Sequence, residues 1–136
     1  NIDGKKPHLE NQPDYIDESI DLGYYVEIDV WLIDGVLFLG HDEPRYEISA
    51  EWLEKRYENI WVHCKNIKAL ELFNALRSYH YFWHEEDTLT LTSKGVVWAY
   101  PGKQPIKGSI AVMPEINNDL VFECIGICSD YIKRYK

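Results

Sequence analysis

Two carboxylates and a histidine are the residues of this chain best suited to chemistry. Glu27 and Asp29 lie two apart in the apolar, β-branched run of residues 26–30, and His41 follows shortly after. In a strand, alternate side chains point to the same face, so both carboxylates would do so. Neighbouring carboxylates repel each other unless a cation lies between them, and a divalent ion is the usual one. Because histidine can exchange a proton near neutral pH, the set predicts hydrolysis or transfer at a phosphate ester.

The alternative for Glu27 and Asp29 is a solvent-facing edge of an alternating strand. However, their face also carries Tyr25 and Trp31, and the opposite face is apolar throughout. Both faces therefore resemble those of a buried parallel strand. Because buried carboxylates without a partner are costly, a bound cation or a catalytic role is favoured.

His63 and Lys65 repeat the spacing of two at the end of the next predicted strand, residues 60–64. Neutral imidazole can bind a metal ion, and a lysine can hold a phosphate oxygen as a point charge. The alternative for Lys65 is a solvated position at the start of the following helix.

Three weaker candidates for substrate binding come later in the chain. His84 opens a polar cluster after a predicted strand, and Glu115 follows an apolar strand. Residues at strand ends commonly line sites in α/β folds. Trp98 could belong to an aromatic wall of the same site. A solvated loop is the alternative for His84, and core packing is the alternative for Trp98.

The elements that must position these residues follow from periodicity, caps and turns. We expect helices at 13–22, 50–57 and 66–77, and strands at 24–33, 36–39, 60–64, 79–83, 88–92, 96–100, 109–113 and 124–128. The repeated strand–helix–strand order predicts an α/β fold with a mainly parallel sheet. Because a complete eight-stranded barrel needs about 200 residues or more, we expect either a minimal or truncated TIM-type β/α barrel with shortened or missing helices, or an open sheet.

Bulk composition narrows the class of protein. The chain has 136 residues, which predicts a single domain, and its net charge of −9 argues against a nucleic-acid coat. It has no apolar run long enough to span a membrane and no secretory signal. The three cysteines are Cys64, Cys124 and Cys128. Their number and spacing predict reduced thiols in a cytoplasmic protein rather than a disulfide framework or a zinc site.

The first third of the chain resembles the glycerophosphodiester phosphodiesterase family, metal-dependent TIM-barrel enzymes of the phospholipase-C-like superfamily. The superfamily also includes the spider-venom phospholipase D enzymes. The resemblance extends more weakly to His63-x-Lys65 and to residues 127–130. It rests on the order and spacing of Glu10-Asn11, a helix, Gly23, Glu27-x-Asp29-Val30, Asp34-Gly35 and His41-Asp42.

The resemblance implies that Glu27 and Asp29 bind a divalent ion, Mg²⁺ or Ca²⁺, and that His41 acts as general acid or base. It implies that Lys65 holds the phosphate of a small phosphodiester substrate. His63 stands where the family has an acidic third metal ligand. The family also opens with a strand that ends in His-Arg-Gly, whose histidine pairs with the one matching His41. Residues 1–136 contain no such motif, so either the first strand is missing from this chain or the protein never had it.

Two functions are therefore expected from the sequence. The first is a metal-dependent phosphodiesterase acting on glycerophosphodiester-like or phospholipid-like substrates. The alternative is a catalytically degenerate barrel that binds a phosphorylated ligand or a protein partner. The short length, the imidazole of His63 at an acidic position and the missing first histidine favour this alternative.

Overall fold

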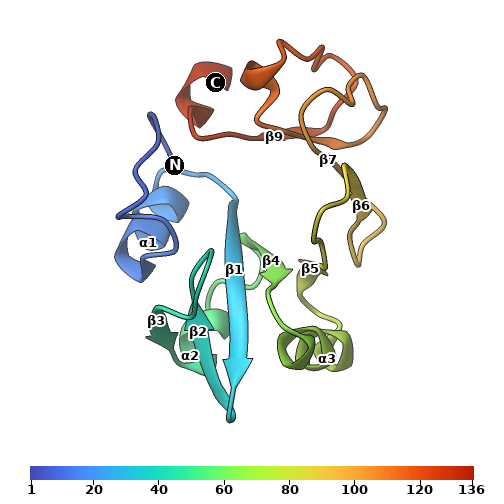
Figure 1. The fold of residues 1–136 in the computed structure, drawn as a ribbon. Coiled ribbons are helices and arrows are strands. Elements are labelled where there is room, and N and C mark those ends of the chain that lie inside the picture. The colour runs from blue at the N-terminus through green and yellow to red at the C-terminus, as the bar shows by residue number, and fades with distance from the viewer. The chain divides into compact units, whose positions relative to one another are not determined.

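The computed structural model describes residues 1–136, which divide into two compact units (Figure 1). We call residues 7–83 the first unit, and residues 1–6 together with 84–136 the second unit. Whether the two units form the single domain expected from the sequence stays a prediction.

The first unit is built on one mixed sheet of five strands in the order β3-β2-β1-β4-β5. Strands β1, β4 and β5 run parallel to one another, while β2 and β3 return antiparallel beside β1. In chain order the elements are α1 (Pro13–Asp21), β1 (Val26–Ile33), β2 (Val36–Leu39), β3 (Tyr46–Ile48), α2 (Ala50–Glu54), β4 (Ile60–Cys64), α3 (Ile67–Leu76) and β5 (His80–Phe82).

Local sequence signals explain where these elements begin and turn. Pro13 occupies the first turn of α1, and the hydroxyl of Ser49 caps α2 by accepting a hydrogen bond from Trp52 N at 3.0 Å. Asp34 and Gly35 have φ angles of 49° and 78°, the left-handed values of a tight β-hairpin turn. These features confirm the expected first helix and hairpin.

Asn66 both starts α3 and attaches it to the sheet. Its Oδ1 accepts hydrogen bonds from Ala69 N at 3.0 Å and from Leu32 N at 3.2 Å. Its Nδ2 donates to Leu32 O at 2.9 Å. One side chain therefore caps the helix and ties it to β1, which places α3 against β1 and β4.

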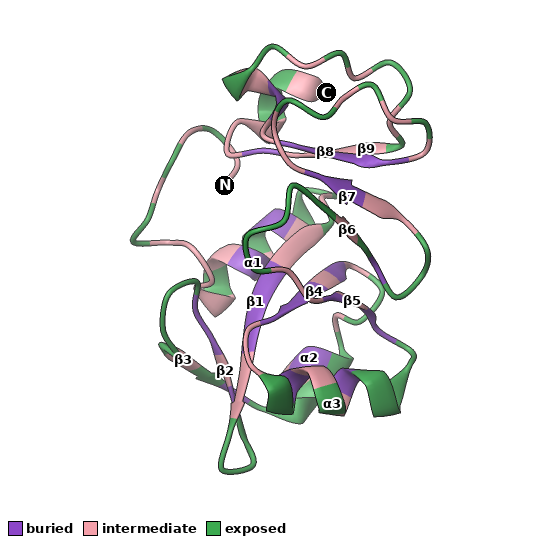
Figure 2. Ribbon diagram, turned by 45° about the vertical axis from the view of Figure 1, so that its right-hand side comes forward, coloured by how far each residue is buried: buried purple, intermediate pink, exposed green.

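The core of the first unit lies on the face of β1 and β4 opposite the carboxylates. Ile28, Val30 and Val62 have no exposed surface, and Ala69 and Phe73 of α3 are equally buried. Figure 2 shows the central part of β1 buried, whereas the turn after it is exposed. Apolar burial on this face leaves the other face of the same strands for polar side chains.

The second unit contains a four-stranded sheet in the order β6-β7-β8-β9. Strand β6 is antiparallel to β7, and the remaining pairs are parallel. The start of the chain joins this unit, since Gly4 N donates to Asp130 O at 2.7 Å. Its elements are β6 (Leu89–Leu91), β7 (Val97–Ala99), β8 (Ile110–Val112), the 3₁₀ turn η1 (Pro114–Ile116), β9 (Gly126–Cys128) and the 3₁₀ turn η2 (Ile132–Tyr135).

The expected TIM-type barrel is wrong. The strands form two separate sheets, and no strand of one pairs with a strand of the other, so no closed ring of strands exists. A parallel barrel needs a crossover of a dozen or more residues after every strand. Strands β6 to β9 have no intervening α-helix, and β1 is followed by an antiparallel hairpin. The short strand β3 and the 3₁₀ turn η1 were also not expected.

None of the helices in this structure is long and apolar enough to cross a membrane.

Candidate metal centre

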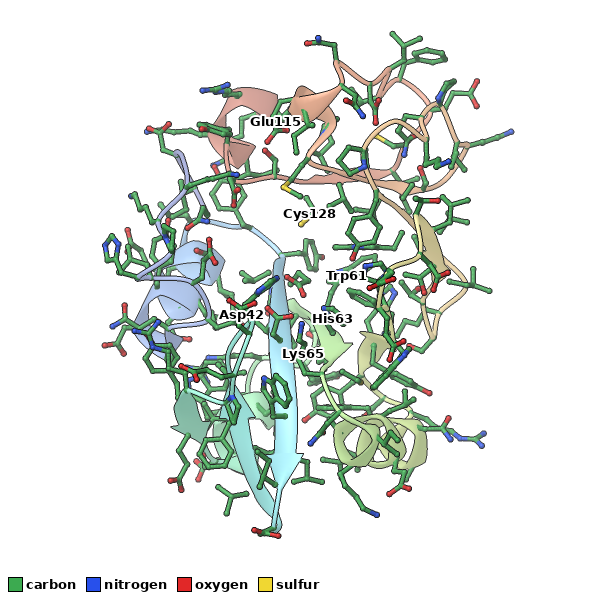
Figure 3. All side chains as sticks on the ribbon, viewed as in Figure 1. Asp42, Trp61, His63, Lys65, Glu115 and Cys128 are labelled. Carbon is green, nitrogen blue, oxygen red and sulfur yellow. The ribbon has the colours of Figure 1, made fainter.

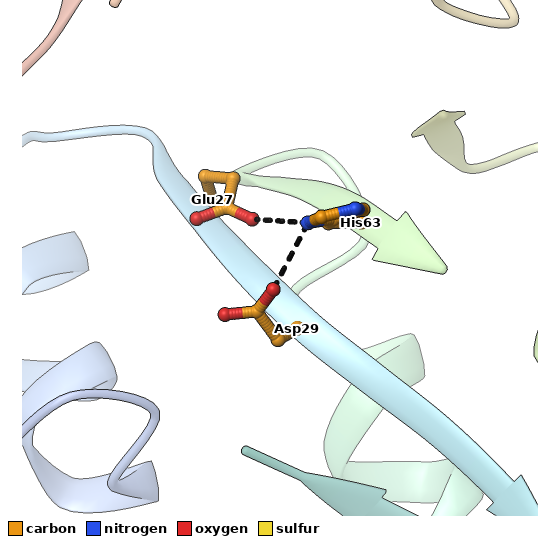
Figure 4. Close-up of side chains that lie close together, drawn as sticks. All are labelled: Glu27, Asp29 and His63. Atoms are coloured by element: carbon orange, nitrogen blue, oxygen red, sulfur yellow. Dashed lines mark ion pairs between the residues drawn. The ribbon is translucent and has the colours of Figure 1, made fainter. Parts of the chain in front are cut away.

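The candidate metal centre lies on the polar face of β1 and β4. The register of this parallel pair sets Asp29 opposite His63, and Glu27 lies two residues before Asp29. Side chains of paired residues point to the same face, and so do side chains two apart. Glu27 and Asp29 therefore project from β1 toward the imidazole of His63 on β4, as Figure 4 shows.

The ligand atoms of these three residues converge. His63 Nδ1 lies 3.0 Å from Asp29 Oδ1 and 3.7 Å from Glu27 Oε1. One ligand atom from each of the three residues lies within 4.8 Å of the others, so the cluster can hold a metal ion. This geometry agrees with two expectations from the sequence. Glu27 and Asp29 lie on one face of the strand, and His63 belongs to the same cluster.

Asn11 orients the central carboxylate, a role that the sequence did not reveal. Its Nδ2 donates to Asp29 Oδ2 at 2.8 Å, and its Oδ1 accepts from Asp29 N at 2.8 Å. Asn11 itself has a left-handed φ of 59°, which asparagine tolerates better than most residues. The only sequence signal was its place beside Glu10 in the family-like motif.

The second oxygen of Asp29, Oδ1, faces the centre of the cluster. It is buried and has no well-aligned hydrogen bond, although His63 Nδ1 lies 3.0 Å away. Lys65 Nζ is 3.5 Å from the same oxygen, and the Lys65 side chain is 16% exposed. A buried carboxylate oxygen with lone pairs not committed to a well-aligned donor can act as a metal ligand, while the nearby ammonium group of Lys65 reduces the negative charge there.

The two carboxyls differ in their proton affinity. Burial raises the pKa of Glu27 well above its usual value, and repulsion from Asp29 raises it further, while Lys65 opposes both. Burial also acts to raise the pKa of Asp29, but His63, Lys65 and Asn11 together hold it below its usual value. Asp29 is therefore the carboxylate that stays ionised, and Glu27 is the one that most needs a cation.

Aromatic side chains continue the polar face onto β5. Register sets Trp61 opposite His80 and His63 opposite Phe82. The His63 ring stacks on Phe82 with centroids 5.0 Å apart and planes 10° apart. Trp61 stacks on His80 at 3.6 Å. Figure 3 shows Trp61, His63 and Lys65 beside β1, and the stacking restrains how the imidazole can turn.

His41 begins the loop that leaves β2 next to Asp29. Gly40 N donates to Asp29 O at 3.1 Å, and Trp31 Nε1 donates to Gly40 O at 2.7 Å. The imidazole of His41 is 64% exposed, and its Nδ1 lies 2.8 Å from Asp42 Oδ1. The structure thus ties the residue before His41 to Asp29 and leaves the His41 ring accessible.

The other candidates lie in the second unit, where each has a partner. The His84 ring stacks on Tyr100 at 4.2 Å. Trp98 is buried, which agrees with the core-packing alternative. The Glu115 carboxylate accepts hydrogen bonds from Ser129 Oγ at 2.7 Å and from Tyr135 OH at 3.1 Å. A role for these three residues in substrate binding stays a prediction.

Comparison with protein-family models, with curated proteins and with solved structures finds no match.

Proposed function

We propose that this protein is a metal-dependent phosphodiesterase that acts on small glycerophosphodiester-like or phospholipid-like substrates. The observation that carries the proposal is the convergence of Glu27, Asp29 and His63 on one point, with a lysine beside them. The order of the motif residues, similar to that of glycerophosphodiester phosphodiesterases, supports the same chemistry. The family's barrel does not enter the proposal, because the sheets are not closed.

The donor set fits a divalent ion. Asp29 Oδ1 is buried without a well-aligned hydrogen bond, and Glu27 supplies a second carboxyl group, whose pKa burial raises and a nearby positive charge lowers. Glu27, Asp29 and His63 would hold the ion. When bound, such an ion neutralises charge that develops on a phosphate oxygen.

The chain's own residues account for orientation and proton transfer. Lys65, whose ammonium group lies 3.5 Å from Asp29 Oδ1, carries a cation that can pair with a phosphate oxygen. His41, whose Nδ1 lies 2.8 Å from Asp42 Oδ1, would act as the general acid or base. In the reaction, a neighbouring substrate hydroxyl attacks phosphorus and loses its proton, while the departing alcohol oxygen gains one.

One observation favours a second function, a phosphate-binding module without catalysis. Lys65 and His63 already lie within 3.5 Å of Asp29 Oδ1, so the carboxylate is compensated in part without a metal ion. Such a site could hold a phosphorylated ligand through Lys65 alone. Metal dependence separates the two functions.

The test is turnover of glycerophosphocholine, which carries a hydroxyl beside its phosphodiester, by the full chain with added divalent ions. We expect metal-dependent turnover that is lost in Asp29→Asn and in His41→Ala. Asp21→Asn, at the exposed end of α1, is the matched control and should keep it. The binding module would be supported instead of the enzyme by phosphate binding without turnover. A chelator should leave that binding unchanged, and Lys65→Ala should abolish it.

A further inference from the structure

We propose that the centre selects a divalent transition-metal ion of the Mn²⁺-to-Zn²⁺ series over Mg²⁺ and Ca²⁺, and that the imidazole of His63 decides this choice. The inference rests on the proposed function, because it assigns the metal of the same site. It departs from the expectation of Mg²⁺ or Ca²⁺ that the family resemblance implied.

The first argument is the identity of the converging atoms. The cluster offers carboxylate oxygens from Glu27 and Asp29 and a nitrogen, His63 Nδ1. Ca²⁺ takes six to eight oxygen ligands, and Mg²⁺ takes carboxylates and water in an octahedron. Imidazole nitrogen suits zinc, iron and other transition metals. The affinity of mixed nitrogen and oxygen sites for divalent ions generally rises from Mn²⁺ towards Cu²⁺ and is also high for Zn²⁺. One nitrogen among three protein ligands therefore moves the preference away from hard ions.

The second argument is that the imidazole nitrogen is held in place. The His63 side chain is 11% exposed, and its ring lies nearly parallel to that of Phe82. Its Nδ1 is 3.0 Å from one carboxylate oxygen and 3.7 Å from the other. Ligand atoms about 2.0 to 2.2 Å from a tetrahedral metal ion lie about 3.4 Å apart. The two His63 separations bracket that value, and all three ligand atoms lie within 4.8 Å of one another, so side-chain shifts within the cluster would complete the site.

The third argument is electrostatic. Two carboxylates supply a formal charge of −2, which the ammonium group of Lys65, 3.5 Å from Asp29 Oδ1, reduces to −1. Hard dications depend on ligand charge for their affinity. A third carboxylate at position 63 would restore that charge, whereas a neutral imidazole does not. Bonding to nitrogen compensates a transition-metal ion for the missing charge, and it does so less for Mg²⁺ or Ca²⁺.

An independent observation points to a ligand at this place. Asp29 Oδ1 is buried and has no well-aligned hydrogen bond, while its sister oxygen is held by Asn11 at 2.8 Å. The fold thus directs one carboxylate oxygen into the cluster, where its neighbours are His63 and Lys65 at ion-pair distance. Such an atom in a buried position is costly unless something binds it.

The experiment measures metal affinity directly, so it is separate from turnover. The full chain is stripped with a chelator, and dissociation constants for Zn²⁺, Mn²⁺, Mg²⁺ and Ca²⁺ are obtained by competition dialysis and calorimetry. The variants are His63→Glu, which supplies an oxygen in place of the nitrogen, and Asp29→Asn. His8→Gln, at an exposed position in the same unit, is the control for metal bound at surface histidines. Circular dichroism verifies that each variant is folded.

We expect one Zn²⁺ or Mn²⁺ per chain, bound more tightly than Mg²⁺ or Ca²⁺ and weakened in Asp29→Asn. Because any nitrogen-containing site prefers late transition metals, the deciding quantity is the Zn²⁺-to-Mg²⁺ affinity ratio. It should fall by about tenfold or more in His63→Glu and stay constant in His8→Gln. An unchanged ratio in folded His63→Glu, or tighter binding of Mg²⁺ or Ca²⁺ in the wild type, overturns the inference.

Selective metal binding without turnover would uphold this inference and remove the phosphodiesterase proposal. Turnover that is supported only by Mg²⁺ or Ca²⁺ would uphold the phosphodiesterase proposal and overturn this inference. The two proposals can therefore fail independently.

Discussion

The amide of Asn11 holds Asp29 from two sides, by accepting a hydrogen bond from the Asp29 backbone and donating one to its carboxylate, both at 2.8 Å. Asn11 precedes α1, whereas Asp29 lies in the middle of β1. The contact fixes the χ angles of the aspartate and turns Oδ1 toward His63 and Lys65. A residue outside the cluster thus sets the direction of its central ligand.

The first prediction concerns this contact. Asn11→Ala should weaken metal binding by about tenfold, because residues that orient metal ligands typically contribute 10- to 100-fold. It should lower the free energy of unfolding by about 1–2 kcal/mol. Calorimetry with Zn²⁺ and denaturant unfolding measure the two effects. Gln12→Ala is the control, because Gln12 makes no side-chain cap bond, and equal loss in both variants would contradict an orienting role.

The second prediction concerns the turn before His41. A Cβ on Gly40 would lie 1.9 Å from Glu43 O, so Gly40→Ala must displace the loop that carries His41. We expect turnover to fall about a hundredfold or more, as for a misplaced acid or base, while zinc affinity changes much less. Gly35→Asn, in the hairpin turn, is the control, because asparagine accepts the left-handed φ there. Normal turnover in Gly40→Ala would exclude His41 from the reaction.

The third prediction concerns stability away from the site. The guanidinium of Arg56 forms a two-pronged ion pair with Asp17, donates to Trp52 O at 2.7 Å and lies 4.2 Å from the centre of the Trp52 ring. Lysine cannot reproduce this fork. Arg56→Lys should therefore lower the free energy of unfolding by about 1–3 kcal/mol, measured by urea denaturation.

The control for Arg56 is an exposed ion pair of the same region. Lys55 pairs with Glu51 at 2.7 Å, with both side chains largely exposed. Such pairs contribute about 0.5 kcal/mol or less, so Lys55→Ala should have little effect. Equal destabilisation by both substitutions would show that the Arg56 contacts are not specific.

The fourth prediction concerns pH and thiol chemistry. Burial raises the pKa of the Cys64 thiol to about 12, from an ordinary value of 9.0. Above pH 9 the unfolded state therefore releases the thiol proton, whereas the folded state keeps it until the pH approaches 12. The resulting stability is fully present below pH 9 and is lost as pH rises toward 12, at up to about 1.4 kcal/mol per pH unit.

Thiol labelling measures the same property at neutral pH. Cys64 should react with a thiol reagent only after unfolding, whereas Cys124 and Cys128 are partly exposed and should react in the folded protein. Cys64→Ser should leave the native labelling unchanged and remove the alkaline loss of stability that the thiol causes. Rapid native labelling of Cys64 would contradict its burial in the core of the first unit.

Much of the secondary structure followed from sequence patterns alone. Pro13, Ser49 and Asn66 start helices at the expected places, and Asp34-Gly35 makes the expected hairpin turn. Such features depend on neighbouring residues, because caps and turns satisfy backbone groups a few positions away. The spacing of two also sufficed to place Glu27 and Asp29 on one face, since alternation is a property of every strand.

Only the tertiary structure decided the contacts between distant segments. The register of β1 against β4 sets Asp29 opposite His63, and a shift of one residue would have turned the imidazole to the other face. Asn11, which precedes α1, reaches Asp29 in β1, 18 residues further along the chain. The closed barrel expected from the strand order does not form, because the strands pair into two separate sheets. Local patterns specify strands and faces, but the choice of partner depends on the balance of burial and hydrogen bonding over the whole chain.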